Sequence, residues 1–210
     1  MRIHLIKTTL SGEKGIASQQ DRFTATRARI IDAAQNMFIK EGYFATTMQI
    51  IMREANVSKG GMYHHFDSKE DMFAEIFSQV SKASITEAAS HGTKGKTSLD
   101  VIYNSAVAWL KVMREPKVAS ILLEQGPSVL GWKRARAIEE KDSLKSLVIM
   151  FQKAQQAGEI NIGSVTTVAK LFNALLAESA FIDIEFGDPS WPQIEHIIKL
   201  FLDGLVNTGT

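Results

Sequence analysis

The sequence predicts an all-α fold of about nine helices, on three observations. Apolar residues recur three and four residues apart along most of the 210 residues, which is the spacing of one helix face. No useful length of sequence alternates apolar and polar residues, as a half-buried β-strand would. Gly, Pro and Asn interrupt the helical pattern at intervals that suit separate helices, and there is no internal repeat.

Composition places the chain among ordinary globular proteins. Hydrophobic residues make up 45% and charged residues 22%. The absence of Cys excludes disulfides and thiolate metal sites, and it fits a reducing cytoplasm, where we expect the protein. No apolar run approaches the ~18 residues that span a membrane. Lys7 also interrupts any signal-peptide core, so we expect neither secretion nor a membrane partner.

The first predicted helix follows a segment without periodicity. Residues 1–22 mix Ser, Gly, Gln, Lys and Thr, so we expect a flexible N-terminal arm there. Beyond the arm, Ile30, Ala34 and Phe38 share one face of a helix that ends at Gly42.

Residues 46–70 hold the most informative pattern in the chain. Thr46 is a favourable N-cap, and Gln49 three residues later completes a capping-box pattern, so a helix is expected over 47–55. Asn56 tolerates the left-handed conformation better than most residues, and it stands where this helix must turn.

A second short helix, over residues 59–65, follows directly and can be capped by Ser58. Two short helices joined by a tight turn present the second helix to the major groove of DNA. Reading of double-stranded DNA is therefore the leading hypothesis, with helix 47–55 bracing the reading helix against the backbone. Gly60 and Gly61 each cost ~1 kcal/mol of helix stability relative to Ala, which a close backbone approach to DNA would explain.

Polar side chains of this segment are expected to contact phosphates, and the start of helix 59–65 to lie nearest the bases. The N-terminal arm could also reach a groove, although a disordered tail is the commoner form of such a segment. Seven Lys and Arg against four Asp and Glu over residues 22–69 support DNA binding only together with the motif. The residues expected to bind DNA are Thr46, Thr47, Ser58, Lys59, Gly60, Gly61, Met62, Tyr63, His64, His65 and Lys69.

The same segment resembles the DNA-binding motif of the TetR family of bacterial transcriptional regulators. The resemblance is specific over about residues 24–84, and it implies a homodimeric, ligand-responsive repressor with a helical C-terminal domain. Gly61 stands where the family usually has Thr, Ser or Ala, so one side-chain contact to DNA is absent. The matching residues are Thr46-Thr47, Ala55-x-Val57-Ser58, Tyr63-His64-His65-Phe66 and Ser68-Lys69-Glu70.

The remaining sequence predicts helices only. A helix after Ser68 runs to about Ala89, and the Gly- and Lys-containing break at 91–98 follows it. We therefore expect a DNA-binding domain over residues 23–90 and an effector-binding and dimerisation domain over 91–210. The helices expected in the second domain are one from about Leu99 to Met113, one from Pro116 to Gly126, a long one ending at Gly158, and two over 164–186 and 191–205.

The last two helices are candidates for a dimer interface. Helix 164–186 has apolar residues on more than one side, whereas a helix with one solvent-exposed face has them on one side only. Taken alone, the core of a monomer explains this pattern, but a dimer would present two reading helices to two half-sites ~34–36 Å apart. The candidate interface residues are Val168, Leu175, Phe181, Ile182, Ile194, Ile197, Ile198 and Phe201.

Large apolar side chains of the second domain, most of them between residues 99 and 160, could line a chamber for a small, largely apolar effector. For each of them, filling of the core is the more common role. The candidate lining residues are Tyr103, Trp109, Met113, Trp132, Met150, Phe151 and Phe172.

Catalytic patterns are missing from the sequence, so we expect no enzyme. No phosphate-binding Gly loop, nucleophile elbow or zinc-protease motif occurs, and neither a metal nor another cofactor is implied. The motif indicates DNA binding, and the resemblance to the TetR family implies a repressor released by a small molecule. The alternative is a ligand-independent, architectural DNA-binding protein controlled by a protein partner, and a solid C-terminal core would favour it.

Overall fold

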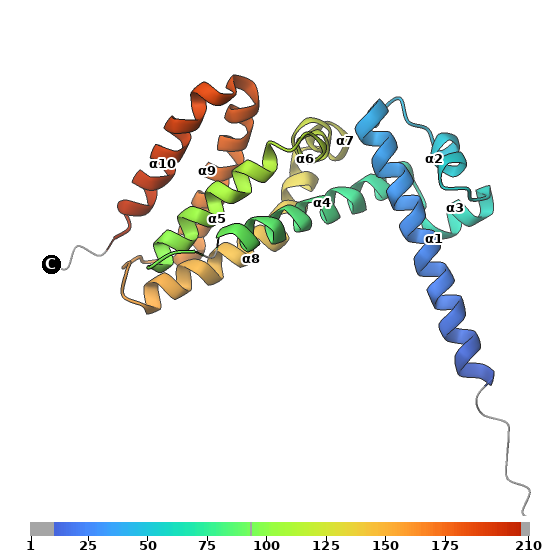
Figure 1. Cartoon of the computed structure of the whole chain (residues 1–210), viewed down its shortest axis with the longest axis horizontal. Helices are drawn as coiled ribbons and strands as arrows, with labels where there is room; N and C mark the ends of the chain where they lie inside the picture. Colours follow the sequence, from blue (N-terminus) through green and yellow to red (C-terminus); the bar gives the residue numbers. More distant parts are fainter. Residues whose placement is uncertain (1–10, 93, 207–210) are drawn as a thin grey trace, which may run out of the picture. The chain divides into compact units, whose positions relative to one another are not determined.

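The computed structural model describes residues 11–92 and 94–206. Its regular elements are helices throughout, which confirms the predicted all-α class, and an isolated bridge between Ile160 and Val206 is the one β-type contact in the described ranges (Figure 1). The chain divides into two compact units, Met1–Phe73 and Ala74–Thr210, called here the N-terminal and C-terminal units.

The N-terminal unit contains α1 (Ser11–Glu41), α2 (Met48–Glu54), α3 (Lys59–His65) and the start of α4 (Lys69–Gly92). Its core is built from large side chains with no exposed area, and the Phe38 and Phe73 rings meet with centroids 5.5 Å apart. The three helices predicted for this domain are therefore present. The core residues are Ile30, Phe38, Ile51, Met62, Met72 and Phe73.

Two predicted boundaries need correction. Residues 11–22, expected in the flexible arm, belong to α1, whereas residues 1–10 lie outside the described residues. No Pro interrupts residues 11–22, so a helix anchored by its packed C-terminal half can propagate through them at low cost. The units divide at Phe73 rather than at the break over 91–98, because the first turn of α4 packs in the N-terminal unit and the rest of α4 belongs to the C-terminal unit.

The C-terminal unit combines the remainder of α4 with α5 (Ser98–Met113), α8 (Trp132–Gln156), α9 (Val165–Phe186) and α10 (Trp191–Asp203). Helices α5, α8, α9 and α10 pack on one another around the Phe151, Phe172 and Phe201 rings, whose successive centroids lie 5.5 and 5.3 Å apart. Each long helix was predicted from its apolar spacing. The short 3-10 turn η2 (Asp188–Ser190) joins α9 to α10.

The segment predicted as one helix from Pro116 to Gly126 is more irregular. It consists of α6 (Pro116–Ala119), a π-helical stretch η1 (Ser120–Gln125) and α7 (Gly126–Leu130). A Cβ atom at Gly126 would collide with the ring of Phe77, so a close approach requires glycine here.

Helix α9 was predicted over 164–186 and is found over Val165–Phe186, but the expectation that no apolar run approaches a membrane span needs correction, since this helix, with a mean hydropathy of 1.3, reaches the length and composition of a membrane-spanning helix. One such helix is weak grounds for a membrane protein, because the core helix of a soluble protein passes the same test. Within its unit, α9 packs against α5, α8 and α10. It also buries Asp183, whose Oδ2 and Oδ1 each accept a 2.6 Å hydrogen bond from Arg114.

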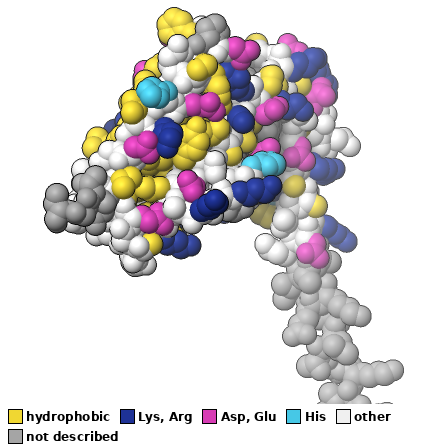
Figure 2. Space-filling model, turned by 60° about the vertical axis from the view of Figure 1, so that its left-hand side comes forward, with side chains coloured by type: hydrophobic (Ala, Val, Ile, Leu, Met, Phe, Trp, Pro, Cys, Tyr) yellow, Lys and Arg dark blue, Asp and Glu magenta, His cyan; other side chains and the backbone are white. Residues whose placement is uncertain are grey.

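Apolar side chains on the outer faces of α9 and α10 correct the predicted interface set. Ile194 and Ile198 face the interior and are buried, so they are not available to a partner. The other predicted residues are partly or largely exposed, and Leu171 and Leu200, which were not predicted, are 59% and 55% exposed. Figure 2 shows hydrophobic side chains grouped among charged ones on one face of the molecule. The exposed apolar surface of α9 and α10 is defined here by Leu171, Ile184, Phe186, Ile197 and Leu200.

Candidate functional site

The beginnings of α2 and α3 are each fixed by a side-chain cap. Thr47 Oγ1 accepts a 3.3 Å hydrogen bond from the backbone N–H of Ile50, and Ser58 Oγ accepts one of 3.1 Å from that of Gly61. Asn56 has φ 51°, the left-handed conformation expected of it. These local bonds hold α2 and α3 as two short helices with a tight turn, the arrangement predicted for reading DNA.

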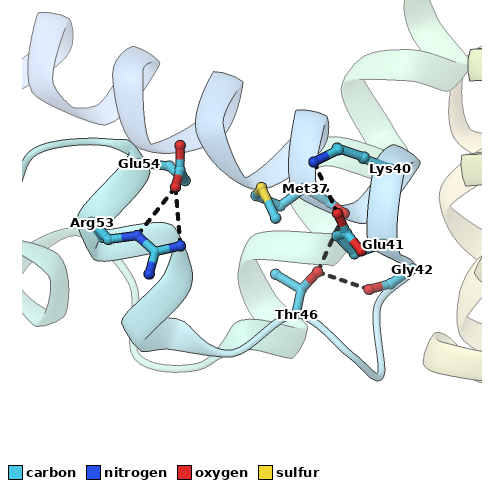
Figure 3. Close-up of polar contacts among 7 residues, drawn as sticks. All are labelled: Met37, Lys40, Glu41, Gly42, Thr46, Arg53 and Glu54. Carbon is cyan, nitrogen blue, oxygen red and sulfur yellow. Dashed lines mark hydrogen bonds and ion pairs between the residues drawn. The ribbon is translucent and has the colours of Figure 1, made fainter.

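Thr46 has a different role from the one predicted. Its side chain is fully buried, and its hydroxyl lies 2.8 Å from the carbonyl oxygen of Gly42 and 3.3 Å from that of Met37 (Figure 3). Thr47, rather than Thr46, caps α2. The prediction that Thr46 binds DNA is therefore wrong, because its one hydroxyl proton is used to hold the loop after α1.

Met62 is also fully buried, so its side chain cannot face the bases as predicted. It lies on the side of α3 that packs into the core of the N-terminal unit. The exposed residues of α3 are Lys59, Gly60, Tyr63 and His64, which lie one to three positions from Met62, because each residue step turns the helix by about 100°.

Lys69 makes hydrogen bonds inside the N-terminal unit. Its Nζ donates hydrogen bonds of 2.7 Å to the backbone carbonyls of both Tyr43 and Thr46, and it lies 4.0 Å from the centre of the Tyr43 ring. Burial lowers the pKa of Lys69. Its ammonium group therefore ties the loop between α1 and α2 to the start of α4, and the phosphate contact of Lys69 stays a prediction.

The two adjacent histidines differ in environment. The His65 ring packs against Phe23 with centroids 4.3 Å apart, and its Nδ1 is buried without a hydrogen-bond partner among the described residues. Burial, with smaller contributions from His64 and Arg27, lowers the pKa of His65, so the neutral ring is favoured. The half-buried His65 thus packs inside the unit and its DNA contact stays a prediction, whereas His64 is exposed.

Arg27 of α1 holds the end of α3. Its guanidinium donates a 2.6 Å hydrogen bond to the carbonyl of His65 and lies 4.0 Å from the centre of the Phe66 ring. Because a helix end leaves carbonyls without intrahelical partners, this bond fixes the C-terminal end of α3. No local sequence signal links Arg27 to His65, which lies 38 residues away.

The remaining predicted residues lie together at the surface. Lys59, Gly60, Tyr63 and His64 are exposed and lie on neighbouring parts of the α3 surface, since Lys59 and Tyr63, and likewise Gly60 and His64, are four residues apart and Gly60 and Tyr63 are three apart. We call these four residues the reading face. Thr47 and Ser58, the two capping residues, are exposed beside it in the sequence, and Gly61 is half-buried.

The C-terminal unit contains a separate candidate site, a cavity of about 280 Å³ among α4, α5, α8 and α9. Trp109 and Met150 line it as predicted. Met113, Phe151 and Phe172 are instead buried in the core, and Tyr103 does not line this cavity either. The lining residues are Ile85, Ala88, Ala89, Val101, Ile102, Ser105, Ala106, Trp109, Ser143, Ser146, Leu147, Met150, Asn173 and Leu176.

A smaller cavity of about 50 Å³ shares Trp109 and Asn173 with the larger one. Trp132, a predicted lining residue, contributes to this second cavity instead. Neither the serines of the larger cavity nor Glu139 of the smaller one were selected from sequence. Polar residues on a mostly exposed helix such as α8 give no signal that they face inward.

Two family models match the chain: bacterial regulatory proteins of the tetR family over residues 30–76, and the tetracyclin repressor-like C-terminal domain over residues 99–205. The chain belongs to the TetR family. The HTH-type transcriptional regulator YvkB of Bacillus subtilis is 26% identical over 188 residues, which cover 86% of this chain and 97% of YvkB. QacR of Staphylococcus aureus is 46% identical over 48 residues, which cover 23% of this chain and 26% of QacR.

Solved structures of TetR-family proteins share the fold. A regulator from Pectobacterium atrosepticum superposes with a TM-score of 0.75 at 22% identity, over 89% of this chain and 96% of its own. RolR in complex with resorcinol gives a TM-score of 0.69 at 14% identity, over 89% of this chain and 90% of its own. The protein is thus a DNA-binding transcriptional regulator of the TetR family, a family of regulators rather than enzymes.

Proposed function

We propose that this protein is a homodimeric repressor that binds a double-stranded DNA operator through α3 and is released by a small, largely apolar effector. The observation that carries the proposal is the reading face. It combines a cation, a phenol, an imidazole and an unobstructed glycine on the exposed surface of a helix whose other side is buried.

The chemistry of the reading face suits the major groove. The Lys59 ammonium neutralises a phosphate, and Tyr63 and His64 donate hydrogen bonds to phosphate oxygens or base edges. A Cβ at Gly60 would meet nothing within 4 Å, so the backbone of α3 has open space in front of it. Close approach of this backbone to the bases would account for glycine in a short helix.

Dimerisation through α9 and α10 would supply the second reading helix. The exposed apolar surface of these helices has the character of a surface that is covered in a stable assembly. A two-fold dimer presents two copies of α3 to half-sites about one helical turn apart, so the operator is expected to be an inverted repeat.

The cavity favours an effector over the alternative of a ligand-independent architectural protein. That alternative fits a solid C-terminal core, whereas the about 280 Å³ cavity approaches the about 300 Å³ at which small-molecule sites begin. Helix α4 is continuous from Lys69, in the N-terminal unit, to the cavity wall at Ile85 and Ala88. A ligand that binds the protein tenfold more tightly when α4 is in one position than when it is in another supplies ~1.4 kcal/mol of coupling to DNA binding.

Selection of binding sites from random DNA, followed by titration of the selected duplex, tests the DNA-binding part. We expect an inverted repeat, and we expect the Lys59→Ala/Tyr63→Ala variant to bind it at least about tenfold more weakly with a smaller salt dependence. Lys145→Ala, which removes an exposed lysine of the C-terminal unit, serves as the control and should bind like the unaltered protein. Equal affinity of the double variant and the control would refute the assignment of α3.

A further inference from the structure

The smaller cavity of the C-terminal unit combines aromatic rings with a carboxyl group. Trp109, Trp132 and Phe181 line it together with Glu139, and the Trp132 and Phe181 ring centroids lie 6.2 Å apart. Because Trp109 and Asn173 also line the larger apolar cavity, the two cavities are neighbours on either side of these side chains. One molecule could therefore place its apolar body in the larger cavity and its end group in the smaller one.

Glu139 is the group in this cavity whose charge is least compensated. Its carboxylate has no hydrogen bond or ion pair to another residue of the described chain, and Ser143 donates only to its backbone carbonyl. Burial raises the pKa of Glu139 to about 7; the positive charge of Arg136 lowers it and the negative charge of Glu140 raises it. A partly buried carboxylate without a partner is costly, so the site favours a species that brings a positive charge.

Arg136 is the other charged residue that lines the cavity, and it is already paired. Its Nε lies 2.8 Å from Oε1 of Glu140, one helical turn further along α8. Among the described residues that line the cavity, Glu139 is therefore the carboxylate that has no ion pair of its own, although the nearby charge of Arg136 stabilises its ionised form in part. The adjacent Glu140 differs from Glu139 because its carboxylate forms an ion pair with Arg136.

We propose that the smaller cavity is a subsite for the basic end of an amphipathic effector, with a protonated amine held by Glu139 and the surrounding aromatic rings. This inference rests on the proposed effector site and names its ligand class. The rings support it independently of the carboxylate, since the faces of Trp and Phe attract cations. The volume of about 50 Å³ suits a small head group, because about 10–15 Å³ is enough for one water molecule.

Three probes that share one apolar body test the charge preference: 4-phenylbutylamine, 4-phenylbutan-1-ol and 4-phenylbutyrate. Binding to the full-length protein is measured by calorimetry and by quenching of tryptophan fluorescence. We expect the amine to bind at least about tenfold more tightly than the alcohol, and the carboxylate to bind more weakly than either.

The matched variants are Glu139→Gln and Glu140→Gln, which remove the same charge from adjacent residues of α8. Glu139→Gln should reduce the amine's affinity to that of the alcohol while leaving the alcohol's affinity within about twofold, and Glu140→Gln should retain the preference. The unchanged affinity for the alcohol reports that the cavity of the variant is intact. Equal binding of amine and alcohol by the unaltered protein, no binding of any probe at millimolar concentration, or full amine binding by Glu139→Gln would each overturn the proposal.

The pH dependence gives a second readout. An alkylamine stays protonated well above neutrality, because its pKa resembles the about 10.4 of a lysine side chain. Glu139 must be ionised to hold the ammonium group, so the amine's affinity should fall as the pH drops through about 7, while the alcohol's affinity stays constant. The dependence should disappear in Glu139→Gln, and its persistence there would contradict the role of Glu139.

These measurements separate the ligand class from the proposed repression. If the amine binds through Glu139 but does not release the protein from its selected DNA site, the subsite stands and release by this class of ligand is wrong. If the protein binds no DNA at all, the assignment of α3 as the reading helix is wrong. The amine titration does not depend on that result.

Discussion

The two units of the protein place their functional residues in opposite environments. In the N-terminal unit the reading face projects from α3 into solvent, and each buried neighbour, such as Met62, belongs to the core. In the C-terminal unit the candidate groups, Trp109 and Glu139 among them, line partly open cavities among packed helices. The exposed face of one helix can be predicted from the spacing of its residues, whereas a cavity depends on how several helices pack together.

In both units a cationic side chain holds an irregular segment in place, but the two side chains bind different groups. Lys69 binds neutral backbone carbonyls, those of Tyr43 and Thr46. Arg114 instead neutralises Asp183, approaches Asp188 at 3.0 Å and lies 4.4 Å from the centre of the Trp191 ring. Hydrogen bonds to Asp183 raise the pKa of Arg114 further above its usual value. Removal of Arg114 leaves a buried charge, but removal of Lys69 leaves only unpaired carbonyls.

The largest effect is therefore expected for Arg114→Met. The Asp183 side chain is only 4% exposed, so the variant leaves a buried carboxylate without its cation and should lose about 3 kcal/mol of the free energy of unfolding. Denaturant titration monitored by circular dichroism measures the loss. Addition of Asp183→Asn should recover part of it, because the second change removes the uncompensated charge.

Lys199→Met is the matched control for Arg114→Met. Lys199 pairs with Asp203 at 3.1 Å, but both side chains are more than half exposed, so the change should cost less than about 0.5 kcal/mol. An equal loss in both variants would mean that the α5–α9 contact contributes no more than a surface pair.

A smaller effect is expected for Lys69→Met in the N-terminal unit. The variant loses two charge-assisted hydrogen bonds and should lower the free energy of unfolding by about 2 kcal/mol. Because Lys69 is used inside the unit, the salt dependence of operator binding should stay unchanged once the folded fraction is accounted for. Lys40→Met, which removes an exposed lysine paired with Glu41, is the control for stability. If operator binding by Lys69→Met depends less steeply on salt concentration than that of the unaltered protein, Lys69 does contact a phosphate, as the sequence suggested.

Local interactions explain what could be predicted from the sequence. The Ser58 cap, the Asn56 turn and the extent of α3 depend on residues within four positions, so sequence patterns were enough. The choice between Thr46 and Thr47 as the cap of α2 was not local. It depends on the carbonyls of Gly42 and Met37, which only the folded loop brings to Thr46.

The cavity and the candidate dimer surface show why the rest could not be predicted. Met150 lines the larger cavity while its neighbour Phe151 fills the core, a difference of one step around α8. On α10, Ile197 is half exposed and Ile198 is fully buried. Apolar residues cover both sides of these helices, so periodicity alone does not tell an inward side chain from one that a partner could cover.

The smallest effect separates the stability of α3 from its function. Gly60 has open space for a Cβ, so Gly60→Ala should raise the free energy of unfolding by about 0.5–1 kcal/mol, through the lower entropy of the unfolded chain. If the backbone of α3 approaches the bases, the same methyl group should weaken operator binding. Thermal unfolding and DNA titration of one preparation measure the two opposite shifts.

Gly61→Ala is the comparison, because a Cβ there would lie 3.3 Å from Oγ of Ser58 and compete with the cap. A gain in stability at Gly60 with unchanged DNA affinity would place the bases away from this part of α3 and leave recognition to Lys59, Tyr63 and His64.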